Sequence, residues 1–228
     1  MNTRQTFSKV VFVSFTLSIL FFLIGANGYG VIQISSIQDL QKIGNDPGYP
    51  LNGDYELTQD IDASETINWN SGAGFLPIGT ESKPFTGKFN GNGHKIRRLY
   101  INRSGQDFVG LFGYVREGGE ITNLGIEEGW VIGRSYTGIL VGRNGGIVNN
   151  CYSTGSVSGS GDYVGGLVGY NYEGTVSQSY STGSVSGGDF HSVVGGLVGG
   201  NDGTVSQSYS TGSVLGLKYV GGLVGRNN

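Results

Sequence analysis

The side chains best suited to chemistry in this sequence are a few carboxylates. Asp60 and Asp62 lie two positions apart in the phrase QDIDAS, so they could share one face of a strand. Paired carboxylates serve as general acid and base in enzymes that cleave polysaccharides. Asp162 is a further candidate, but it lies at a variable turn position of the repeats. We therefore predict that the protein is not an enzyme and has no catalytic residue. A polysaccharide-active enzyme is the alternative.

Metal and thiol chemistry have weak support in the sequence. His94 and His191 have no adjacent glutamate or second histidine, and the HExxH zinc motif is absent. Cys151 is the single cysteine, and Ser179 and Ser208 take its place in the aligned repeats. This predicts a position for a small residue rather than a catalytic thiol. The sequence therefore predicts no metal and no cofactor.

Internal repetition dominates the rest of the chain. The phrase GTVSQSYSTGSV occupies residues 174–185 and again 203–214. A leucine–glycine core recurs at spacings of 29, 27, 30 and 26 residues, at Leu111, Leu140, Leu167, Leu197 and Leu223. Three or four places before each leucine stands an aromatic or branched residue, namely Phe108, Tyr136, Tyr163, Val193 and Tyr219. This period, without a helix-length apolar stripe, predicts an all-β, right-handed parallel β-solenoid.

Each repeat contains three short β-prone runs, for example residues 164–168, 175–181 and 183–185, separated by turn-forming residues. If repeats stack as coils, each strand pairs in parallel with its equivalent about 4.8 Å away. Like side chains then fall on like, so the stacking itself favours identical phrases. Repetition of this kind indicates a long surface rather than a pocket.

Strand parity predicts which side chains face outward. Ser179, Ser181 and Val185 share one face of the repeated phrase, and Tyr180 shares the other. If Val185 points inward, then Tyr152, Tyr180 and Tyr209 form an outward aromatic column, which is the predicted ligand-contact surface. A turn that switches the parity would instead bury this tyrosine ladder, and the sequence leaves both possibilities open.

The N-terminal part differs from the repeats. Arg4 and Lys9 precede an apolar run over residues 10–24, and Ala26-Asn27-Gly28 resembles a cleavage site. We predict a signal peptide over residues 1–28 and hence secretion or exposure at the cell surface; an uncleaved anchor is the alternative. Residues 29–103 are predicted to form an irregular N-terminal cap and first coils, including a short helix in IQDLQKIGND, and residues 104–228 the solenoid repeats.

Charge gives no support for a nucleic-acid partner. The chain has 14 basic and 17 acidic residues, and loss of the predicted signal peptide would remove only basic ones. A basic cluster contains Lys88, Lys95, Arg97, Arg98 and Arg103. Its residues suit either a solvated flank of the cap or contact with anionic glycans or phospholipid headgroups.

The stretch GGLVGYNYEGTVSQSYSTGSV, at residues 165–185, resembles the GLUG motif, a short repeat of bacterial and some archaeal surface proteins. These include adhesin-like proteins and the stalk-like parts of immunoglobulin-A-cleaving peptidases. The resemblance implies an extracellular adhesion or scaffolding module, with a glycan or a host or neighbouring cell-surface protein as partner. It also makes a stalk fragment of a larger surface protease an alternative. The sequence stops at GGLVGRNN, before the rest of the next coil. This predicts either that the chain is a fragment of a longer surface protein or that the open coil associates with another copy.

Overall fold

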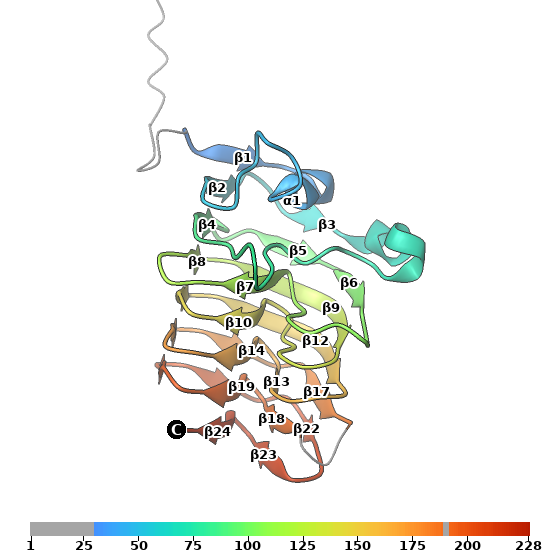
Figure 1. The fold of residues 1–228 in the computed structure, drawn as a ribbon, viewed down its shortest axis with the longest axis vertical. Helices are drawn as coiled ribbons and strands as arrows, with labels where there is room; N and C mark the ends of the chain where they lie inside the picture. Colours follow the sequence, from blue (N-terminus) through green and yellow to red (C-terminus); the bar gives the residue numbers. More distant parts are fainter. Residues whose placement is uncertain (1–29, 189–191) are drawn as a thin grey trace, which may run out of the picture.

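The computed structural model describes residues 30–188 and 192–228, which form a stack of parallel coils along the long axis of the molecule (Figure 1). The predicted all-β parallel solenoid is confirmed. The predicted signal peptide and His191 lie outside the described residues. No helix in the described part is long and apolar enough to cross a membrane.

The first coils contain the helices. The predicted short helix is confirmed as α1 (Ile37–Lys42), and it begins at Ser36, whose side-chain oxygen accepts a hydrogen bond from the Asp39 N–H. A 3-10 helix, η1 (Ser64–Gly72), projects from the stack (Figure 1). The strands here are β1 (Ile32–Ile34), β2 (Asp54–Leu57), β3 (Ile61–Asp62), β4 (Lys88–Asn90), β5 (Lys95–Arg97) and β6 (Tyr100–Asn102).

The remaining coils consist of strands and turns. Their first strands are β7 (Phe112–Val115), β8 (Glu120–Thr122), β9 (Gly125–Gly133), β10 (Val141–Asn144), β11 (Ile147–Asn149) and β12 (Tyr152–Gly159). The next are β13 (Val164–Gly165), β14 (Val168–Asn171), β15 (Thr175–Ser177), β16 (Tyr180–Ser181), β17 (Ser184–Gly187) and β18 (Val193–Gly195). The last are β19 (Val198–Asn201), β20 (Thr204–Ser206), β21 (Tyr209–Ser210), β22 (Val214–Leu215), β23 (Tyr219–Gly221) and β24 (Val224–Asn227).

Parallel pairing joins equivalent strands of successive coils into sheets. One sheet runs β1-β2-β4-β8-β11-β15-β20, so strands of residues 30–103 continue directly into the repeats. A five-stranded sheet runs β7-β10-β14-β19-β24, and a third runs β3-β5-β9-β12-β16-β21, with β6, β17 and β22 beside it. Val148 lies opposite Val176, and Val176 opposite Val205. Equivalent side chains therefore stack in the register that the repeats predict.

Each coil has more corners than the sequence indicates. The structure breaks the expected run 164–168 into β13 and β14, and the run 175–181 into β15 and β16. Gln178 separates β15 from β16 with a φ of 51°, a left-handed conformation that ends the strand. At the other corner, a Cβ added to Gly166 would lie 2.3 Å from the Gly196 carbonyl oxygen in the next coil. The turn there depends on this close approach.

The core is a set of apolar ladders between the sheets. Leu111, Leu140, Leu167 and Leu197 are fully buried, and Val185 is also buried, as the parity argument predicts. In the first coils larger side chains fill the interior, and Phe85 and Phe112 lie with ring centroids 5.0 Å apart. Other apolar residues of these coils are also fully buried, namely Phe89, Ile96, Leu99 and Ile101.

A buried asparagine ladder lies at one corner of the stack. The Asn144 amide donates to Asn171 Oδ1 at 2.8 Å, and the Asn171 amide donates to Asn201 Oδ1 at 2.7 Å. Asn201 continues the ladder to Asn227 at 2.7 Å. Asn171 also donates to the Gly174 carbonyl oxygen at 3.0 Å. The ladder thus satisfies buried polar groups of each turn with those of the next coil.

Replacing Asn171 with alanine should lower the free energy of unfolding by about 2–4 kcal/mol, because it leaves buried amide groups of Asn144 and Asn201 without their partner. Asn149→Ala is the matched control, since Asn149 is partly exposed and water can replace its bond to Ser177. Denaturant unfolding followed by circular dichroism measures both. Equal losses of unfolding free energy in the two variants would show that the buried ladder contributes no more to stability than an exposed hydrogen bond does.

Gly169 tests the close approach of neighbouring coils. A Cβ at this position would lie 2.5 Å from the Thr137 backbone nitrogen and 2.6 Å from the Gly142 carbonyl oxygen. Gly169→Ala should therefore destabilise the protein by about 1–3 kcal/mol or more, because backbone of the adjacent coil must move. Gly105→Ala is the control, since a Cβ there meets nothing within 4 Å. A Gly169→Ala variant as stable as Gly105→Ala, by the same unfolding measurement, would contradict the packing.

Candidate ligand-contact surface

The predicted tyrosine column is present and faces outward. The Tyr152 and Tyr180 rings have centroids 5.0 Å apart and planes 5° apart, and Tyr180 and Tyr209 repeat this with 5.0 Å and 4°. Tyr209 is 52% exposed, whereas Ser179 and Ser181 beside Tyr180 are buried. The turn at Gln178 therefore does not reverse the parity, and the buried alternative is wrong.

At the N-terminal end of the column, Tyr152 is held by contacts with a glycine and a carboxylate. A Cβ added to Gly125 would lie 2.4 Å from the Tyr152 ring, so the ring covers the backbone of the preceding coil. The Tyr152 hydroxyl donates to Glu127 Oε1 at 2.8 Å. Burial and this hydrogen bond both raise the pKa of the Tyr152 phenol. The first ring of the column is thus held in place, while the rings further along are more exposed.

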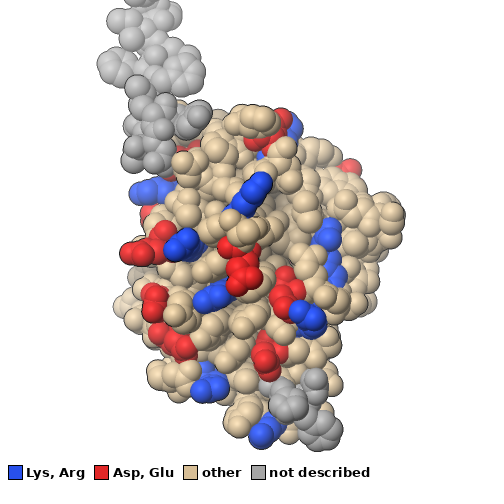
Figure 2. Space-filling model, in the orientation of Figure 1, with Lys and Arg blue, Asp and Glu red and all other residues tan. Residues whose placement is uncertain are grey.

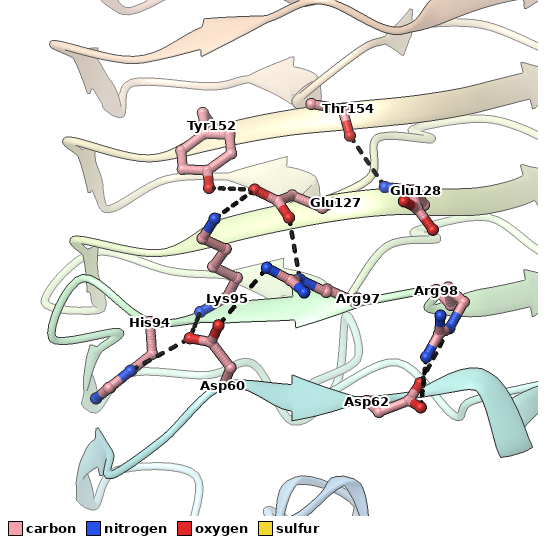
Figure 3. Close-up of polar contacts among 10 residues, drawn as sticks. All are labelled: Asp60, Asp62, His94, Lys95, Arg97, Arg98, Glu127, Glu128, Tyr152 and Thr154. Carbon is pink, nitrogen blue, oxygen red and sulfur yellow. Dashed lines mark hydrogen bonds and ion pairs between the residues drawn. The ribbon is translucent and has the colours of Figure 1, made fainter.

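A network of charged residues adjoins the column on the same sheet (Figure 3). Glu127 accepts from Lys95 at 2.9 Å and from Arg97 at 3.1 Å, besides Tyr152. The hydrogen bond from Lys95, followed by that from Tyr152, lowers the pKa of Glu127. Asp60 lies 3.8 Å from Arg97 and 3.3 Å from the Nδ1 of His94. His94 directly follows the turn at residues 92–93.

Two of the carboxylates considered for acid–base chemistry, Asp60 and Asp62, lie beside cations. Arg98 Nη2 lies 2.5 Å from Asp62 Oδ2, and this hydrogen bond lowers the pKa of Asp62 to about 2. A general acid needs a raised pKa, so Asp62 is poorly suited to that role. Asp162 lies in the exposed turn before β13, on a different sheet. Within residues 30–188 and 192–228 no group of three or more His, Cys, Asp or Glu could hold a metal.

The predicted basic cluster does not form a free cationic patch. Lys88 pairs with Glu120, and Arg103 donates to the Phe75 carbonyl oxygen, while the other three members pair with acids of neighbouring coils. In the view of Figure 2 basic and acidic side chains are interspersed over the surface. Of the two interpretations offered for this cluster, the solvated, ion-paired flank describes the observed contacts.

Cys151 occupies the small-residue position that the repeats predict. Its backbone N–H donates to Ser179 Oγ at 3.1 Å, and the Ser179 N–H donates to Ser208 Oγ at 3.1 Å. The thiol is fully buried, and this burial raises its pKa. A thiolate is therefore disfavoured, and the side chain serves packing rather than nucleophilic chemistry.

Two further groups of aromatic residues lie on the surface. Trp130 on β9 is 57% exposed and lies edge-on to Tyr100, 6.4 Å between ring centroids, and no pattern in the sequence indicates this pair. Several half-buried rings also gather around Arg143 on the five-stranded sheet, where Phe108 and Tyr136 stack at 4.8 Å. The recurrence of a mostly aromatic residue three or four places before each leucine is a signal for this second group, but it does not reveal the arginine at its centre.

Comparison with known proteins supports the repeat assignment. Residues 160–186 match the family described as the GLUG motif. Halomucin of Haloquadratum walsbyi is 42% identical over 142 residues, which are 60% of this chain and 2% of halomucin. A candidate Gly-rich membrane protein of Evansella cellulosilytica is 36% identical over 99 residues, 42% of this chain and 11% of that protein. The chain thus spans a small part of the length of these relatives.

The solved structures include a similar fold. The crystal structure of a candidate immunoglobulin A1 protease from Bacteroides ovatus superposes with a TM-score of 0.70 and 25% sequence identity, over 87% of this chain and 62% of that one. The stacked coils, the recurring leucine–glycine core and the match at residues 160–186 agree with one another. This chain is a parallel β-solenoid protein that carries the GLUG motif.

Proposed function

We propose that this chain is a non-enzymatic module of a secreted or cell-surface protein, and that it serves adhesion or scaffolding. The outward column of Tyr152, Tyr180 and Tyr209 is the observation that carries this proposal. The names of the similar proteins, a halomucin and a candidate membrane protein, support a surface location. Among the repeats, recognition would use an extended face rather than a cleft.

The column suits contact with sugar rings or with a protein surface. Its rings are stacked 5.0 Å apart and are already ordered, so a partner that packs against them fixes few further torsions. Tyr180 and Tyr209 are the more accessible members, because Tyr152 is tied to Glu127. A glycan or a host or neighbouring cell-surface protein is the proposed partner.

The alternatives are a polysaccharide-active enzyme and a stalk of a larger surface protease. Fold similarity to a candidate immunoglobulin A1 protease favours the second of these, which is itself a non-catalytic role for these residues. The enzyme has less support, because Asp62 pairs with Arg98 and Asp60 lies beside Arg97 and His94. The hydrogen bond from Arg98 lowers the pKa of Asp62 and so disfavours its use as a general acid.

Replacing both Tyr180 and Tyr209 with serine should weaken binding to glycans or host cells by about tenfold or more, because two stacked aromatic surfaces are lost. A glycan array and a cell-adhesion assay measure this with the purified chain. Tyr219→Ser is the matched control, since Tyr219 is 46% exposed but outside the column. Unchanged binding by a folded double variant would rule out the column as the contact site.

The enzyme alternative has its own test. The purified chain, incubated with uronate polymers with and without calcium, should release no more product than buffer does. Asp60→Asn, Asp62→Asn and Asp162→Asn serve as controls and should fold normally, because exposed ion pairs contribute only about 0–1 kcal/mol. Turnover that one of these substitutions abolishes would establish an enzyme and overturn the non-enzymatic assignment.

A further inference from the structure

The outer face of the five-stranded sheet carries an arginine among tyrosines, which we call the Arg143 cluster. Arg143 on β10 is in register with Tyr114 of β7 and with Tyr170 of β14. Its Cζ atom lies 5.1 Å from the Tyr114 ring centroid and 5.9 Å from that of Tyr170. Tyr172, in the turn after β14, comes to 4.5 Å. These distances are those of cation–π contacts.

A second column of rings extends the Arg143 cluster along the adjacent corner. Phe108 stacks on Tyr136 at 4.8 Å, and Tyr136 stacks on Tyr163 at 5.6 Å. Tyr163 in turn packs against Tyr170, 4.5 Å between centroids, which joins the column to the sheet face. A Cβ added to Gly200 would lie 2.3 Å from the Tyr163 ring, so the absence of a side chain at Gly200 makes room for this ring.

The positive charge in this cluster has no carboxylate partner. Arg97, Arg98 and Arg134 each pair with an acid, whereas Arg143 forms no ion pair within the described residues. Its Nε is buried and without a hydrogen-bond partner. Two of the neighbouring acids are occupied, because Asp107 pairs with Arg134, and Asp202 accepts from the Tyr170 hydroxyl and the Asn228 amide. Asp162 and Glu173, next to Tyr163 and Tyr172 in the chain, do not pair with Arg143.

A half-buried guanidinium next to open aromatic faces matches the chemistry of an acidic sugar. The guanidinium offers several N–H donors to a carboxylate, and tyrosine rings pack against the apolar face of a pyranose. We propose that the Arg143 cluster binds a carboxylate-bearing sugar residue of a glycan. The guanidinium pairs with the sugar carboxylate, and the rings of Tyr170 and Tyr172 contact the sugar.

The surface beside the Arg143 cluster has room for further sugar residues of the glycan. Phe108, the first ring of the column, also lines a cavity of about 490 Å³ between the first coils. Polar side chains line the same cavity and can hydrogen-bond sugar hydroxyls, namely those of Thr80, Lys83 and Gln106 and the carboxylates of Glu81 and Asp107. A ligand that starts at Arg143 can therefore continue along the stacked rings into this cavity.

This inference rests on the proposed function in one respect, the binding of glycans, but it uses a different sheet and different residues. The probe is a mixture of oligogalacturonates, and isothermal titration calorimetry measures its affinity for the full chain. Arg143→Gln should weaken binding by about tenfold or more, because a charge-assisted contact is lost. The same oligomers after reduction of their carboxyl groups should bind the unaltered protein equally weakly.

Arg226→Gln is the matched control, because Arg226 occupies the same outward register position three coils further along. This variant should bind within about twofold of the unaltered protein. Tyr172→Ser is a second test of the cluster; Tyr172 is exposed, so the substitution should leave the fold intact while weakening binding. Unfolding midpoints identify any variant that loses affinity through misfolding.

Three results would overturn the proposal: no binding of oligogalacturonate by the unaltered protein, equal binding of the carboxyl-reduced oligomers, or equal losses in Arg143→Gln and Arg226→Gln. The Tyr180→Ser/Tyr209→Ser variant separates this site from the tyrosine column. We expect that variant to keep its affinity for oligogalacturonate. If it loses binding while Arg143→Gln does not, the column is the acidic-sugar site and the Arg143 cluster is not.

Discussion

Successive coils of this chain are hydrogen-bonded in parallel and in register, and the fixed spacing between them governs which side chain can stand at each position. At about 4.8 Å per coil, each side chain touches its equivalents above and below. An asparagine at such a position finds the amide it needs in the next asparagine, as at Asn144, Asn171 and Asn201. Apolar, amide and aromatic positions consequently each repeat as ladders.

The same spacing explains the high glycine content. At the corners the chain turns sharply, and the backbone of one coil lies against the backbone of the next. At Gly166 and Gly169 any side chain would overlap a backbone atom of a neighbouring coil. Glycine here is a packing requirement of the stack rather than a sign of flexibility. Near the N-terminal end the interior is filled differently, since Phe112 occupies the register position that Val141 and Val168 take in the next coils and packs against Phe85.

How much of this follows from the sequence depends on whether the feature repeats. Identical phrases imply in-register stacking, and alternation along GTVSQSYSTGSV favours Val185 inside, as observed, but leaves open whether Tyr180 faces in or out. The corners are harder to predict, because glutamine is not a residue type that marks the left-handed φ found at Gln178. Side-chain contacts within the irregular N-terminal coils are still harder to predict from the sequence. Arg98 and Asp62 lie 36 residues apart, and nothing in the spacing shows that they meet.

A site confined to one coil of such a solenoid arises where a ladder changes its chemistry. A column of one residue type, such as the stacked tyrosines at 152, 180 and 209, offers the same contact at every coil. The register position of Arg143 differs, since it reads Tyr114, Arg143, Tyr170, Gly200 and Arg226 along the stack. Stacking alone would favour one residue type there. The mixed column instead places one unpaired cation among rings, and a glycine opens space for Tyr163. A ligand that distinguishes one coil from the next must use a position of this kind.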